Sequence, residues 1–143
     1  MGRLVCCLLL LLVADAKADE LFVAHSRDTP SHLWAGLDVT VEETQRDGRV
    51  SIFRVHRHRK GIGAEGRFFV CTMLSLARQR GYVYFLSAKE FGEHNNAVLF
   101  LKELDEDIQA LIDSGYREYE FPERADAEEA AFVKQMCAAA ANM

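Results

Sequence analysis

The most unusual stretch of this 143-residue chain is RVHRHRK, residues 54–60. Because side chains two residues apart in a strand lie on the same face, His56 and His58 would point the same way there. Imidazoles in that arrangement can share a metal ion, although the neighbouring arginines would repel a cation. The third ligand would have to be His25, His32, His94, Glu90 or Glu93. The pattern therefore indicates a candidate metal site at His56 and His58, and a small metal-dependent hydrolase as one function.

The same stretch is also basic enough to bind an anion. Its cationic side chains are Arg54, Arg57, Arg59 and Lys60, and Arg46 and Arg49 come shortly before them. A phosphate, a lipid headgroup or a sulfated glycan would suit such a positively charged surface. The acidic residues between 103 and 129 are alternative partners, because they could neutralise these cations within the fold. An anion or lipid-headgroup binder is therefore a second alternative function.

Residues 61–66, GIGAEG, match the glycine pattern of dinucleotide-binding loops. The residues before them are charged, whereas the buried parallel strand that precedes such a loop is apolar. The chain is also short for a dinucleotide-binding fold. These glycines therefore predict a flexible turn before a helix, and the sequence predicts no cofactor. No serine lies in a nucleophile-elbow motif, so the sequence assigns no catalytic residue.

The first 18 residues have the pattern of a cleavable signal peptide. Arg3 supplies the positive charge, residues 4–13 are all apolar, and Ala16 and Ala18 fit the small positions before a cut at Asp19. Such a run is too short for a membrane-spanning helix, which needs about 20 residues. The sequence therefore predicts a signal peptide at residues 1–18 and a single domain at residues 19–143. That domain is expected to be periplasmic or secreted, and not an integral membrane protein.

Removal of the signal peptide leaves two cysteines, Cys71 and Cys137. An even number of cysteines in an oxidising compartment favours a disulfide between them. The alternative is two unpaired cysteines that pack as small apolar side chains.

The predicted mature domain is acidic. Cleavage removes Arg3, Lys17 and Asp15, two cations and one anion, so the net charge changes from -5 to -6. An acidic surface argues against general nucleic-acid binding. The leading prediction is a non-enzymatic binding module whose partner is an envelope protein or an anionic ligand.

One amphipathic helix is expected to organise the fold. In residues 65–80, a helical period places Thr72, Ser75, Arg78 and Gln79 on the polar side. The apolar residues that share the opposite face are Phe69, Val70, Met73, Leu74, Leu76 and Ala77. Gly81 is expected to end the helix, because glycine adopts the left-handed C-cap conformation without strain.

The remaining pattern predicts strands at residues 21–24, 37–42, 50–55, 82–86 and 97–101, and an edge strand at 116–121. The Asp47-Gly48 pair predicts a hairpin, and the aromatic stretch 82–86 predicts a central strand paired with 97–101. Helices are expected at residues 104–112 and 126–141, the latter with a capping box at Asp126 and Glu129. The fold class is therefore α+β, with a mainly antiparallel sheet of about four to five strands. The central helix and a C-terminal helix pack this sheet, and a parallel crossover through the central helix is the alternative.

Overall fold

The computed structural model describes residues 20–29, 32–58, 64–88 and 95–141. Its strands are β1 (Val23–His25), β2 (Val39–Asp47), β3 (Val50–Arg57), β4 (Tyr84–Ser87) and β5 (Asn96–Leu101), and its helices are α1 (Glu65–Gln79), α2 (Ile108–Asp113) and α3 (Ala127–Ala141). The strands form one sheet in the order β1-β2-β3-β5-β4, and every pairing is antiparallel. The prediction of an α+β fold with an antiparallel sheet is confirmed. Because β3 and β4 are each antiparallel to β5 between them, they run parallel to one another, and α1 connects them as the crossover that the alternative predicted. None of the described helices is long and apolar enough to cross a bilayer.

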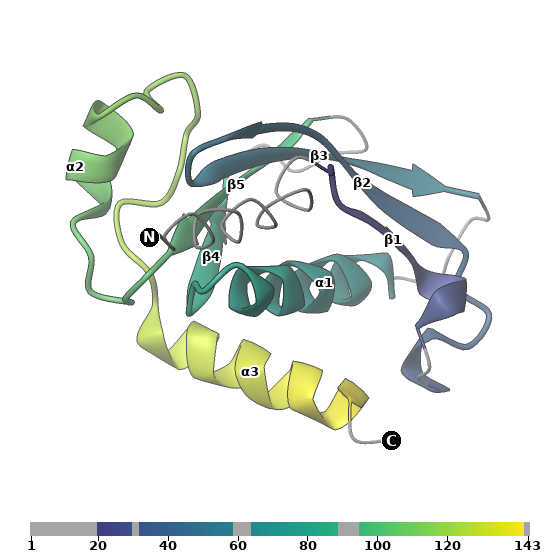
Figure 1. The fold of residues 1–143 in the computed structure, drawn as a ribbon. Helices are drawn as coiled ribbons and strands as arrows, with labels where there is room; N and C mark the ends of the chain where they lie inside the picture. Colours follow the sequence, from purple (N-terminus) through teal and green to yellow (C-terminus); the bar gives the residue numbers. More distant parts are fainter. Residues whose placement is uncertain (1–19, 30–31, 59–63, 89–94, 142–143) are drawn as a thin grey trace, which may run out of the picture.

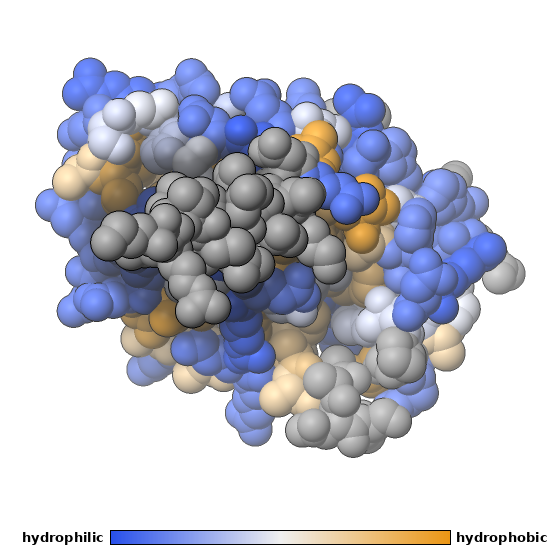
Figure 2. Space-filling model, viewed as in Figure 1, coloured by the Kyte–Doolittle hydropathy of each residue, from blue (hydrophilic) through white to orange (hydrophobic). Residues whose placement is uncertain are grey.

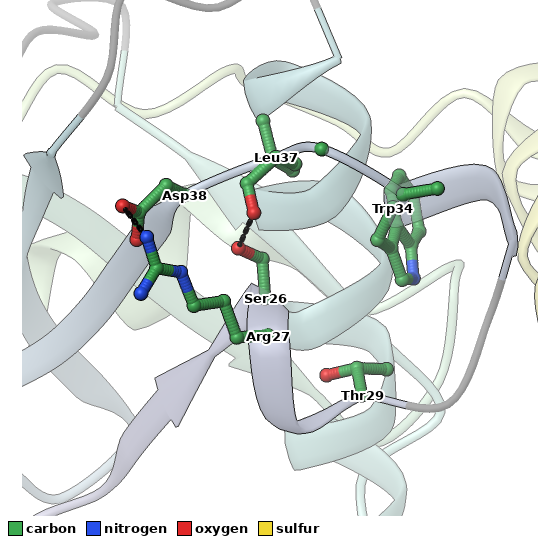
Figure 3. Close-up of a pocket in the computed structure, with 8 residues that line it drawn as sticks. Ser26, Arg27, Thr29, Trp34, Leu37 and Asp38 are labelled. Atoms are coloured by element: carbon green, nitrogen blue, oxygen red, sulfur yellow. Dashed lines mark hydrogen bonds and ion pairs between the residues drawn. The ribbon is translucent and has the colours of Figure 1, made fainter.

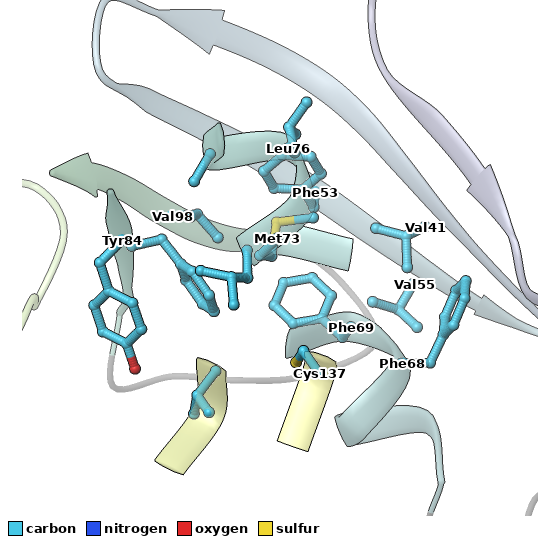
Figure 4. Close-up of a cluster of buried hydrophobic side chains, with 14 of the residues drawn as sticks. Val41, Phe53, Val55, Phe68, Phe69, Met73, Leu76, Tyr84, Val98 and Cys137 are labelled. Carbon is cyan, nitrogen blue, oxygen red and sulfur yellow. The ribbon is translucent and has the colours of Figure 1, made fainter. Parts of the chain in front are cut away.

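The elements stack in three layers. The sheet lies on one side of α1 and α3 lies on the other, while α2 stands at one end of the sheet (Figure 1). Strand side chains alternate between faces, so Val41, Phe53 and Val98 point toward α1 and pack on Phe69 and Met73 (Figure 4). This cluster is the main core.

Helix α1 agrees closely with its prediction, but it is buried more widely. Thr72 was expected on the polar side and is buried, as is Phe68. The helix is covered twice, by the sheet and by α3, so a single apolar stripe underestimates its buried surface. Cys71 lies on the α3 side and forms a disulfide with Cys137, with a distance of 2.08 Å between the two Sγ atoms.

The hairpin between β2 and β3 is confirmed, and its turn is tied to a distant segment. Gly48 has a φ of 54°, a conformation that glycine adopts without strain. The Tyr116 hydroxyl donates to the Asp47 carbonyl and accepts from the Arg49 N–H, each at 3.2 Å. The chain after α2 is thereby fixed against this turn.

Two strand predictions are wrong. The stretch around β4 was expected in the centre of the sheet, but β4 is an edge strand. Its side chains Tyr84, Phe85 and Leu86 are nevertheless buried, because elements on both faces cover them. Residues 116–121 were expected as an edge strand and instead form turns, with Phe121 buried against the sheet.

The sheet face turned away from α1, called here the outer face, is divided in two. Over β5, β4 and the start of β3 it is apolar and covered by α2 and the segment that follows. The cluster there consists of Val50, Ile52, Leu86, Ala97, Leu99, Leu101, Ile108 and Phe121. Over β1, β2 and the end of β3 the outer face is polar, and no described α-helix covers it.

Candidate functional site

A shallow groove of about 790 Å³ occupies the polar part of the outer face. Its floor is formed by His25, Thr40, Glu42, His56 and His58, which come from β1, β2, β3 and the residue after β3. Val23, Arg27, Asp28 and Asp38 complete its rim. Because three of the five floor residues are histidines, we call it the imidazole groove.

The strand register brings these side chains together. His25 is paired with Thr40, and Thr40 is paired with His56, so three neighbouring strands contribute at one level of the sheet. Alternation then places Glu42 and His58 on the same face. The groove therefore follows from the pairing of β1, β2 and β3.

The hydroxyl of Thr40 is shared by two imidazoles. Its Oγ1 lies 2.9 Å from Nδ1 of His25 and 2.9 Å from Nε2 of His58. A hydroxyl can donate one hydrogen bond and accept another, so it donates to one ring and accepts from the N–H of the other. Both rings are thereby held in fixed orientations, and no hydrogen bond from another described residue is seen at the second ring nitrogen of either.

His56 is oriented by a carboxylate. Its Nε2 donates to Oε2 of Glu42 over 2.9 Å, and the ring stacks on that of His58 with 6.4 Å between centroids. Both predicted metal ligands therefore share a face, as expected, but their Nε2 atoms point to different partners. Within the described residues, no set of three histidine, cysteine or carboxylate side chains could hold a metal ion. His94, Glu90 and Glu93 lie outside these residues, and the metal site stays a prediction.

A smaller pocket of about 350 Å³ adjoins the groove and shares Arg27 and Asp38 with it. These two side chains form an ion pair at one side of the pocket, while Trp34 lines the other (Figure 3). The Ser26 hydroxyl donates to the Leu37 carbonyl over 2.9 Å and accepts from the Val39 N–H. These contacts hold the chain after β1 against the start of β2, which fixes this end of the groove.

The basic side chains of the hairpin find partners inside the fold. Arg49 makes two hydrogen bonds with Glu106, of 2.8 and 3.1 Å. These bonds raise the pKa of Arg49, whereas the pKa of Glu106 is lowered because they outweigh the effect of its burial. Acids of the C-terminal half therefore neutralise part of this cluster, as the internal alternative predicted.

The four residues predicted to bind an anion are not all described. Arg54 and Arg57 are exposed and lie an odd number of positions apart in β3, so they extend from opposite faces of the sheet. These two side chains therefore do not converge on one ligand. Arg59 and Lys60 lie outside the described residues, as do the first three positions of the glycine motif, and both predictions stay open.

A second polar cluster lies on the α1 side of the sheet. Glu43 is buried and accepts hydrogen bonds from Arg46, Arg80 and the backbone N–H of Phe22. Burial alone would raise the pKa of Glu43, but these bonds and one with Ser51 lower it to about 2. The cluster joins β2 to the C-terminal end of α1 and to the residues before β1, and it has no opening to a pocket among those described.

Sequence reasoning missed Thr40 and Glu42. Both fall on the polar side of the alternating stretch at residues 37–42, and the Asp47-Gly48 hairpin pairs that stretch with the histidines. The hairpin register could therefore have found them. His25 was considered only as a third metal ligand, and its place beside Thr40 depends on a three-residue strand that periodicity cannot align.

Comparisons with family models, curated proteins and solved structures find no match to this chain. A proposal about function therefore has to be argued from the arrangement of residues on the sheet.

Proposed function

We propose that the chain is an exported, non-enzymatic binding module and that the imidazole groove is its ligand surface. The observation that carries this proposal is the Thr40 hydroxyl shared between His25 and His58. This hydroxyl holds both imidazoles in place and leaves one nitrogen of each for a ligand. The two rings therefore lose little conformational entropy when they form hydrogen bonds to that ligand.

The groove has features that suit binding better than catalysis. Thr40 is buried, and its hydroxyl is occupied by two imidazoles, so it is poorly placed to attack a substrate. The carboxylate of Glu42 orients His56, but the groove lining has no hydroxyl or thiol other than that of Thr40 to serve this ring as a nucleophile. An imidazole that is oriented but has no available nucleophile suits a recognition surface better than a catalytic site.

Two features support export. Residues 1–18 have the pattern of a signal peptide. The disulfide between Cys71 and Cys137 fits an oxidising compartment, since disulfides are rare in the cytosol. The partner we propose is accordingly a component of the cell envelope or of the surroundings.

The proposal is tested by site-specific photo-crosslinking in the native host. A benzophenone amino acid is placed at Arg54, which is exposed on the outer face beside the groove, and, as a control, at Gln79, which is exposed on α1. We expect a discrete crosslinked species from position 54 and none from position 79. Thr40→Val, which frees both imidazoles from their fixed orientation, should lower the yield at position 54 severalfold. Equal crosslinking at both positions, or none at either, would contradict the proposal.

A further inference from the structure

Within the part of the chain that the structure describes, the outer strand β1 leaves an unpaired backbone edge beside the imidazole groove. The Phe22 carbonyl accepts from the Glu43 N–H, and Ala24 is paired with Val41, so residues 22 and 24 direct their backbone groups toward β2. In an antiparallel ladder the alternate residues direct theirs away, which makes Val23 and His25 the outward pair. Among the described residues, no backbone group hydrogen-bonds to the N–H or carbonyl of Val23.

This edge is also apolar. Leu21 and Val23 are 44% and 49% exposed, whereas the residues of β4, at the other edge of the sheet, are mostly buried. Figure 2 shows hydrophobic side chains at the surface beside the start of β1, surrounded by hydrophilic ones. Exposed apolar residues on a free edge strand are the usual template for pairing with another chain.

The surface behind this edge is negatively charged. The groove lining carries the carboxylates of Asp28, Asp38 and Glu42 against the guanidinium of Arg27. With the exposed Arg54, which is paired with Glu42 on the same face, the net charge is -1 when the imidazoles are neutral. Glu42 is paired with Val23 in the register, and only its Oε2 is bonded to His56. A partner strand is therefore expected to carry positive side chains on this face.

One type of side chain would satisfy both requirements. A strand added to β1 would lie about 10 Å from β2, since neighbouring strands are about 4.8 Å apart. An arginine or lysine opposite Val23 can lay its aliphatic stem across the exposed valine and bring its charged end to Glu42. Because successive side chains alternate, basic residues would recur at every second position of the partner.

We propose that the β1 edge receives an extended segment of a partner protein, with basic side chains at alternate positions. The segment extends the sheet through the N–H and carbonyl of Val23 and the N–H of His25, whose carbonyl already accepts from the Thr29 hydroxyl. Its basic side chains reach over β1 into the groove. This inference rests on the proposed function, because it names the partner of the same groove.

The test uses a labelled, terminally blocked octapeptide of alternating arginine and valine, with fluorescence anisotropy as the readout. The matched control is the same peptide with alternate backbone nitrogens methylated, which keeps every charge but removes the hydrogen bonds of strand pairing. Two methylated peptides cover the two alternations. In one of the two, the methyl groups replace the N–H groups that face β1. We expect that peptide, and a glutamate-valine peptide, to bind at least about tenfold more weakly than the unmethylated arginine-valine peptide.

Two protein variants locate the contact. Val23→Pro removes an outward N–H, a position where an edge strand tolerates proline, and should weaken binding of the arginine-valine peptide about tenfold. Circular dichroism and thermal melting check that this variant folds. If it does not fold, the methylated peptides still show whether backbone hydrogen bonds contribute to binding. Glu42→Gln should weaken binding about fivefold through loss of the charge pair.

Three outcomes would overturn the inference. If the arginine-valine peptide does not bind, the edge does not receive such a strand. If methylation and Val23→Pro leave affinity unchanged while Glu42→Gln lowers it, the groove binds ligand without strand pairing, and the proposed function survives alone. If the protein is a dimer that Val23→Pro dissociates, a second copy occupies the edge. None of these outcomes contradicts the proposed function itself, which the crosslinking experiment tests separately.

Discussion

Five hydrogen bonds among the described residues converge on the carboxylate of Glu43. It is buried between Arg46 and Arg80, and it also accepts the N–H of Phe22. A buried charge is strongly unfavourable when unpaired, so the two guanidiniums and the carboxylate depend on one another. The pKa of Glu43 is lowered to about 2 because these partners stabilise its charged form.

We expect Glu43→Gln to lower the free energy of unfolding by about 3 kcal/mol at pH 7. Since the folded pKa of about 2 lies below the ordinary value of 4.5, Glu43 stabilises the fold fully above about pH 4.5 and loses that effect as pH falls toward 2. The difference between wild type and variant should therefore shrink across this window. Urea denaturation at several pH values measures it.

The control for this prediction is Glu42→Gln, one residue away on the opposite face. Glu42 is part-exposed and pairs only with His56, so its loss should change the free energy of unfolding by less than about 1 kcal/mol. Equal losses for the two variants, or a difference that does not depend on pH, would contradict the role given to Glu43.

Some of these residue contacts could be predicted and others could not. Hairpin pairing was visible from Asp47-Gly48, and internal neutralisation of the basic stretch was an alternative from the outset. The triple contact of Glu43 was not predictable, because its partners Phe22 and Arg80 come from elements whose order in space is not encoded in any local pattern.

At the scale of elements, the attachment of α3 depends on a disulfide together with a small apolar contact. Ala130, Val133 and Cys137 are its buried residues in the core cluster. Two of these three side chains are small, so the hydrophobic contribution of α3 is modest. The bond between Cys71 and Cys137 joins residues that are 66 positions apart in the sequence, and it holds α3 on α1.

Replacing both cysteines by alanine is expected to lower the free energy of unfolding by about 2 to 4 kcal/mol. The amides of α3 should also exchange with deuterium faster than those of α1, because α3 loses its covalent attachment. Hydrogen exchange with mass spectrometry measures both helices in one experiment. Adding a reductant should bring wild type to the stability of the variant and leave the variant unchanged. Unchanged α3 exchange would show that packing alone holds the helix.

Helical period and capping predicted both long helices, since each is a local property. Asp126 accepts from the N–H groups of Glu128 and Glu129, which confirms the predicted start of α3. The place of β4 at the edge could not be predicted in this way. An aromatic strand can be buried in the centre of a sheet, or at an edge that helices and turns cover. Its composition therefore predicts that it is buried but does not predict which strands lie next to it.

For the molecule as a whole, the two halves of the outer face differ in how they are covered. One half is sealed by α2 and the following turns, and the other presents the imidazole groove and the β1 edge. The segment before β1 is itself fixed: the Glu20 carbonyl accepts from Arg46, and the Phe22 N–H donates to Glu43. The first described residues of the predicted mature chain are therefore held against the fold.

Export makes a definite prediction about the mature molecule. Intact-mass measurement of protein purified from its native compartment should give residues 19–143, two hydrogens lighter than the reduced chain because of the Cys71–Cys137 bond. Ala18→Arg should block cleavage and leave the longer chain, since the position before the cut requires a small side chain, whereas Ala18→Ser should be cleaved normally. Full-length protein in the cytosol with two free thiols would contradict export, and with it the proposal that the groove meets a partner outside the cell.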